Sequence, residues 1–210
     1  MKTRVLGVGL TAVAVIGLAL ACEKGGPTSA PAASRVGGIS ASEDAPQAAG
    51  RFSWDLISVN FATGVVSPGG SASARANDGS QITVTGAGTF DLGDAEDVTG
   101  GGTWQTFDAG GASSASGTYQ VTALVRFDVA PGTGASPTVR AGLAVLRISY
   151  SDGSRGILVV SCHLTGTPSV VFEGITASRG FTDFWNRLPP VPGVDGNRTV
   201  FHVINEEEDQ

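Results

Sequence analysis

The chain has 210 residues and a formal net charge of −6, because it holds 13 lysines and arginines and 19 aspartates and glutamates. No lysine follows Lys24, which excludes Schiff-base chemistry on a lysine and P-loop nucleotide binding in the rest of the chain. No basic cluster is present, so we expect no nucleic-acid partner. The acidity favours solubility, and the fold and function have to be argued from the pattern of residues.

The first 21 residues have the features of a helical signal peptide. Lys2 and Arg4 form a short basic head, an apolar run follows, and Ala19-Leu20-Ala21 gives a small-residue exit. This order is typical of secretory signals, and the run is shorter than the roughly 20 apolar residues of a membrane-spanning helix. We therefore predict export.

Cys22 follows directly, and Ala19-Leu20-Ala21-Cys22 resembles the lipobox of bacterial lipoproteins. The resemblance implies a lipid on Cys22, the membrane as a partner through that lipid, and a place in the cell envelope outside the cytoplasm. Residues 22–50 are rich in alanine, serine, glycine and proline, so they predict a flexible tether. The alternative is ordinary cleavage, which would give a secreted soluble protein. A lipid on Cys22 leaves Cys162 without a disulfide partner, and we expect it to be a small buried residue.

A short repeat indicates β-structure in the next segment. Glycine, threonine and an aromatic residue follow one another three times, beginning at Gly88, Gly102 and Gly117. Threonine and aromatic side chains pack well on a pleated surface, and glycine permits a bulge or a sharp bend. The repeat predicts successive strands of an antiparallel meander. A phosphate-binding glycine loop would require a helix after the glycines, and these glycines lead into strand-like runs.

The clearest hairpin signal is Asp152-Gly153, which lies between the runs AGLAVLRISY and RGILVVSCHL. Asp-Gly between two β-prone runs favours a tight turn. On the first run, Leu146, Ile148 and Tyr150 alternate with more polar residues. We therefore expect these three side chains to lie on one buried face.

Residues 51–204 have the length of a single domain. Further strands are predicted at residues 81–90, 102–107, 117–129, 170–176 and 199–204, while residues 52–61 are consistent with a strand or a short helix. Many short strands separated by turns predict an all-β domain. Since neighbouring strands are joined mostly by hairpins, we expect an antiparallel barrel, with a β-sandwich as the alternative. Residues 205–210 are a predicted acidic tail.

Side chains able to carry chemistry are concentrated in residues 161–193, and loops that carry such side chains are where sites tend to lie. In one interpretation, a loop and a short helix of this segment close one end of the barrel. The candidates for proton transfer are His163, His202, Glu173 and Asp183. The candidates for ligand binding are Phe172, Arg179, Phe181, Phe184, Trp185 and Arg187. The aromatic residues of this segment would either plug the barrel end or line a pocket for a small apolar ligand.

No motif for a metal, a cofactor or a nucleophile elbow is present, so we expect neither metal nor cofactor. Two functions remain. The first is a non-catalytic barrel domain that binds a small molecule or a partner. The second is a barrel-mouth enzyme of the isomerase or cyclase type, in which His163 and His202 act with a carboxylate.

Overall fold

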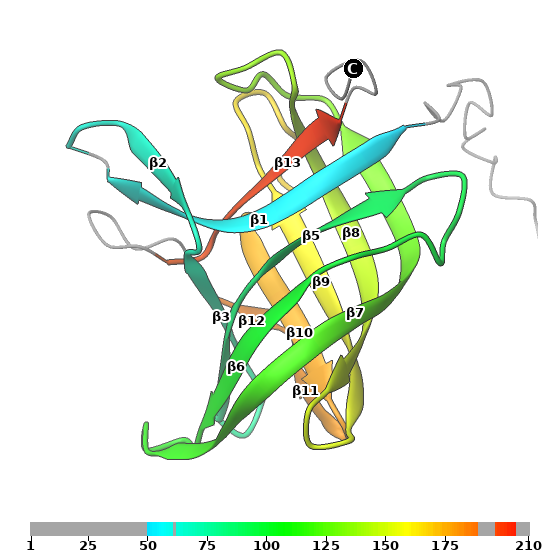
Figure 1. The fold of residues 1–210 in the computed structure, drawn as a ribbon. Coiled ribbons are helices and arrows are strands. Elements are labelled where there is room, and N and C mark those ends of the chain that lie inside the picture. Colours follow the sequence, from blue (N-terminus) through cyan, green and yellow to red (C-terminus); the bar gives the residue numbers. More distant parts are fainter. Residues whose placement is uncertain (1–49, 61, 189–195, 205–210) are drawn as a thin grey trace, which may run out of the picture. The chain divides into compact units, whose positions relative to one another are not determined.

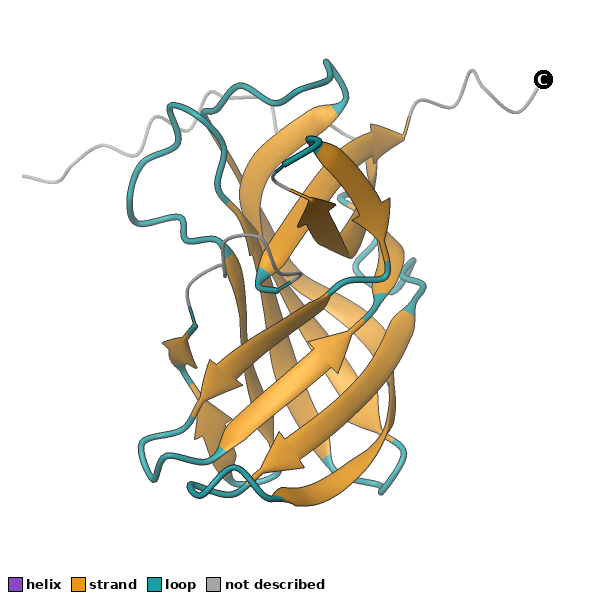
Figure 2. Cartoon of the chain, turned by 90° about the vertical axis from the view of Figure 1, so that its left-hand side faces the viewer, coloured by secondary structure: helices purple, strands orange, loops and turns teal. Residues whose placement is uncertain are grey.

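The computed structural model describes residues 50–60, 62–188 and 196–204. The predicted signal peptide, the lipidation site Cys22, nearly all of the predicted tether and the acidic tail lie outside the described residues. Within them the chain forms thirteen strands and no helix (Figure 2), and none of these residues forms an apolar helix long enough to span a membrane. The strands are β1 (Arg51–Asn60), β2 (Val65–Pro68), β3 (Ser71–Arg75), β4 (Gln81–Thr85), β5 (Ala87–Asp91), β6 (Gly101–Phe107), β7 (Ser113–Ala130), β8 (Val139–Tyr150), β9 (Arg155–Cys162), β10 (Gly174–Arg179), β11 (Thr182–Phe184), β12 (Asn186–Arg187) and β13 (Arg198–Ile204).

Six strands close an antiparallel barrel in the order β1, β5, β6, β7, β8, β13 and back to β1 (Figure 1). The closing pair is β1 with β13, in which Arg51 is opposite Ile204 and Ile57 is opposite Arg198. Closure removes the free edges that an open sheet would present. The predicted all-β antiparallel barrel is therefore confirmed, and the sandwich is not what forms.

The remaining strands extend the sheet beyond this ring. β9, β10 and β11 continue outward from β8, β3 pairs with β4 and β12, and β2 pairs with the second half of β1. The predicted strand at residues 81–90 is split at Gly86 into β4 and β5, because Gly86 adopts a φ of 151°. A Cβ atom there would also overlap the hydroxyl of Tyr119. The predicted strand at residues 170–176 begins only at Gly174.

Aromatic side chains of the strands fill the barrel. Phe52, Phe90, Phe127 and Phe201 are buried in mutual contact, and the ring centroid of Phe127 lies 4.9 Å from those of Phe52 and Phe201. Burying one such ring contributes about 1.5 to 3 kcal/mol. Most of the aromatic filling therefore comes from the barrel strands, and Phe184 of β11 adds one ring to it. The segment for which a plugging helix was one alternative forms the short strands β11 and β12 instead.

The predicted hairpin and repeat occupy the expected places. Gly153 has a φ of 85° in the turn between β8 and β9, and Leu146, Ile148 and Tyr150 all face the core. The aromatic residues of the three repeats, Phe90, Trp104 and Tyr119, are also buried. Cys162 is buried and unpaired, as expected.

Candidate functional site

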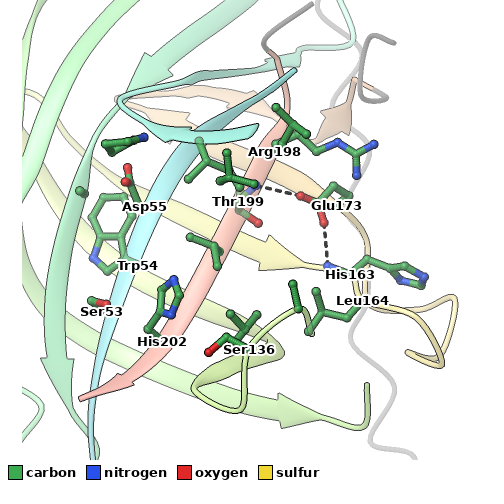
Figure 3. A pocket seen from close by; sticks show the side chains of 18 of the residues that line it. Ser53, Trp54, Asp55, Ser136, His163, Leu164, Glu173, Arg198, Thr199 and His202 are labelled. Atoms are coloured by element: carbon green, nitrogen blue, oxygen red, sulfur yellow. Dashed lines mark hydrogen bonds between the residues drawn. The ribbon is translucent and has the colours of Figure 1, made fainter. Parts of the chain in front are cut away.

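A hollow with a volume of about 770 Å³ lies on the outer face of the barrel, across β5, β1 and β13 (Figure 3). Successive side chains of a strand point to opposite faces of the sheet. Phe52, Trp54 and Leu56 of β1 point into the core, so Ser53, Asp55 and Ile57 point to the outside. In the register of the sheet, Ser53 is opposite His202 and Asp55 is opposite Val200. These outward residues form the floor of the groove.

The walls of the groove are mostly apolar. They come from the outer half of β1, from β2, from the start of β8 and from the loop after β9. The larger aliphatic residues of the lining are Ile57, Val59, Val66, Pro68, Val139, Leu164 and Val200. An apolar groove with a few polar groups on its floor is the usual form of a small-molecule site.

Asp55 is a half-buried carboxylate in this floor. Its Oδ1 atom is buried and has no hydrogen-bond partner among the described residues. Burial raises the pKa of Asp55 above its ordinary value, while the N–H groups of Gly69 and Leu56 and the nearby His202 favour the charged carboxylate. A buried acceptor without a donor costs free energy, so the Asp55 carboxylate lacks one hydrogen bond that would stabilise it.

His202 is a diagonal neighbour of Asp55 on the same face of the β1–β13 pair. Its Nδ1 atom lies 3.2 Å from the Thr138 hydroxyl, and that hydroxyl lies 3.1 Å from the Ser136 hydroxyl. One ring nitrogen is thus engaged by the loop before β8. This contact fixes the orientation of the imidazole over the groove floor.

Glu173 connects the segment after β9 to β13 by hydrogen bonds at the other side of the groove. Its Oε2 accepts a hydrogen bond of 2.7 Å from the His163 N–H, and its Oε1 accepts one of 2.8 Å from the Thr199 N–H. Arg198 lies beside this carboxylate and favours its charged form, but burial is the larger effect and raises the pKa of Glu173. Both carboxylate oxygens are therefore used within the fold.

The four candidates for proton transfer are only partly brought together. His163, Glu173 and His202 all line the groove, but the His163 ring points away from its floor (Figure 3) and lies 2.7 Å from the carbonyl of Val171 through Nδ1. Asp183 is exposed on β11 and does not line the groove. Within the described part of the chain, no three histidine, cysteine or acidic side chains are placed to hold a metal ion.

Of the six candidates for ligand binding, Phe172, Trp185 and Arg187 meet at a second groove on the outside of β8, β9 and β10. The other three lie elsewhere. Phe184 is part of the buried core and Phe181 is fully exposed at the turn before β11. Arg179 has its guanidinium 4.1 Å from the centroid of the Trp104 ring and pairs with Asp152.

Two residues of the first groove, Asp55 and Arg198, are absent from the sequence-based candidates. A signal for Asp55 exists in the run FSWDLISV, where a single carboxylate interrupts an otherwise apolar and hydroxyl pattern. Only the register with β13 shows that it lies near His202.

Comparison with known proteins does not assign the groove. The chain matches no protein-family model, no curated protein and no solved structure. The function therefore has to be inferred from the geometry of the site.

Proposed function

We propose that the barrel is a non-catalytic binding domain that holds a small, largely apolar molecule carrying a protonated amine in the groove over β1 and β13. The observation that carries this proposal is the buried Oδ1 atom of Asp55, which lacks a hydrogen-bond donor within the described chain. A ligand ammonium supplies both the donor and the opposite charge, and charge-assisted hydrogen bonds are stronger than neutral ones.

The surroundings of Asp55 support an apolar ligand body. The groove has a volume of about 770 Å³, which is within the usual range for small-molecule sites. Glu173 already accepts two backbone hydrogen bonds and has Arg198 beside it. Asp55 is therefore the carboxylate that is left to select the ligand charge.

The test is calorimetric titration with octylammonium and with octan-1-ol, which share a chain and differ in charge. We expect Asp55→Asn to weaken octylammonium binding about tenfold, equal to about 1.4 kcal/mol, and to leave octan-1-ol binding unchanged. Asp94→Asn, on the exposed loop after β5, is the matched control. Equal affinities of the wild type for both probes would refute the proposal.

The position of His202 beside Asp55 favours a second candidate function, an enzyme that moves protons in the same groove. The hydroxyls of Thr138 and Ser136 would then orient the imidazole. The two functions differ in the fate of the ligand. A binding domain releases its natural ligand chemically unchanged, whereas an isomerase releases a mixture that mass spectrometry with chromatography resolves.

We further propose that the domain is exported and anchored in the cell envelope through a lipid on Cys22, with residues 22–50 as its tether. The support is the signal-like segment ending in Ala19-Leu20-Ala21 and the cysteine that follows it. Cys22→Ser should move the protein from the membrane fraction to the soluble extracytoplasmic fraction. Retention of this variant in the membrane would contradict the anchor.

A further inference from the structure

The second groove lies on the outer face of β8, β9 and β10 and has a volume of about 640 Å³. Alternation along β9 turns Leu158 and Val160 into the core and leaves Val159 on the outside, opposite Thr176 of β10. Val159 and Leu143 of β8 form an apolar floor. The groove is thus built on rigid, paired strands.

Two aromatic side chains stand beside this floor. Phe172 comes from the segment before β10, and Trp185 comes from the residue between β11 and β12. Trp185 is 55% exposed, which is unusual for so large an apolar side chain in a fold whose other two tryptophans are buried. An exposed indole beside an apolar floor is suited to covering the body of a bound molecule.

Arg187 supplies the charge of this groove. The centre of its guanidinium lies 5.1 Å from the centroid of the Phe172 ring, and no carboxylate among the described residues pairs with it. The contrast is Arg179, which also stacks on an aromatic ring but is neutralised by Asp152. Arg187 therefore presents an exposed guanidinium, with five N–H donors, beside an apolar surface.

We infer that this second groove binds a carboxylic acid with an apolar body, such as a medium-chain fatty acid. The carboxylate pairs with Arg187, since a guanidinium matches carboxylate geometry with two parallel hydrogen bonds. The apolar chain lies over Leu143 and Val159 and against Trp185. This ligand has the charge opposite to that proposed for the groove over β1 and β13, and the inference does not depend on that proposal.

The experiment is calorimetric titration of the purified full chain with octanoate and octan-1-ol, which differ only in the head group. We expect octanoate to bind at least ten times more tightly than octan-1-ol. Arg187→Gln should weaken octanoate binding at least tenfold and change octan-1-ol binding less than twofold. Trp185→Ala should weaken both probes, because it removes a wall that the two chains share.

Two matched variants complete the test. Arg155→Gln removes an exposed arginine at the start of β9, and Asp55→Asn alters the first groove only, so both should leave octanoate binding unchanged. The inference is overturned if octan-1-ol binds as tightly as octanoate, if neither probe binds, or if Arg155→Gln weakens octanoate binding as much as Arg187→Gln. Circular dichroism of each variant verifies that the substitution leaves the barrel folded.

Discussion

Replacing Glu173 by alanine removes the acceptor of two backbone hydrogen bonds, from the N–H groups of His163 and Thr199. The bond from Thr199 is partly buried, and a buried donor left without an acceptor costs about 1 to 3 kcal/mol. The His163 N–H is exposed and can donate to water instead, so the loss of its hydrogen bond to Glu173 destabilises the fold less. We expect Glu173→Ala to lower the free energy of unfolding by about 2 to 3 kcal/mol, which lowers Tm by roughly 4 to 12 °C in a domain of this size.

The glutamine variant separates the charge of Glu173 from its shape. Burial raises the pKa of Glu173 above its ordinary value of 4.5. A raised folded-state pKa adds stability that is fully present below the unfolded-state pKa and is lost as the pH rises through the folded-state pKa. Glutamine does not titrate, so the stability of the wild type relative to Glu173→Gln should decrease as the pH rises from below 4.5 toward neutrality.

Urea unfolding at a series of pH values measures both effects. Glu96, which is exposed on the loop after β5, provides the matched control, and Glu96→Ala should change the free energy of unfolding by less than about 0.5 kcal/mol. A difference between wild type and Glu173→Gln that grows with pH would refute the reasoning from burial. A loss below about 0.5 kcal/mol for Glu173→Ala would show that the two hydrogen bonds do not fasten the groove.

Three further predictions concern the core and the backbone. Phe201→Ala should lower the free energy of unfolding by about 3 to 5 kcal/mol, because its ring is fully buried among other aromatic rings; a loss under about 1 kcal/mol in urea unfolding would contradict a filled barrel. Gly102→Ala should cost about 1 to 3 kcal/mol, since the new Cβ would overlap a carbonyl on β4. At Gly196 a new Cβ would meet no atom of the described residues within 4 Å, so Gly196→Ala should be near neutral in the same assay. Burial raises the pKa of Cys162 to about 12. In a Cys22→Ser background, a thiol reagent at pH 8 should therefore label the protein only after denaturation. Rapid labelling of the folded protein would show that the thiol is accessible.

The sequence was sufficient to predict the barrel because its local signals agree with one another. The Asp152-Gly153 turn, the alternation up to Tyr150 and the glycine-threonine-aromatic repeat each depend on residues close in the chain. The short helix near Trp185 was wrongly expected, since aromatic residues at close spacing suit either element. Strand pairing with β3 and β10 determines the outcome there.

The candidate sites were less predictable, because they depend on contacts between distant strands. His163, Glu173 and His202 were recognised by residue type, and all three line one groove. Asp55 was missed, since its partner strand is more than 140 positions away along the chain. The unpaired charge of Arg187 likewise follows from the fold, because a sequence does not show which arginines find a carboxylate.

The pairing of β1 with β13 has a consequence for the order in which the domain folds. Arg51 and Ile204 are opposite one another, so the ring closes only after nearly the whole domain has been synthesised. Contacts of such sequence separation are slow to form, and the chain therefore stays open during synthesis. The same adjacency makes the domain a good scaffold for circular permutation. A short linker from Ile204 to Arg51, with new ends cut at the turn after Tyr150, would preserve every strand pair of the barrel.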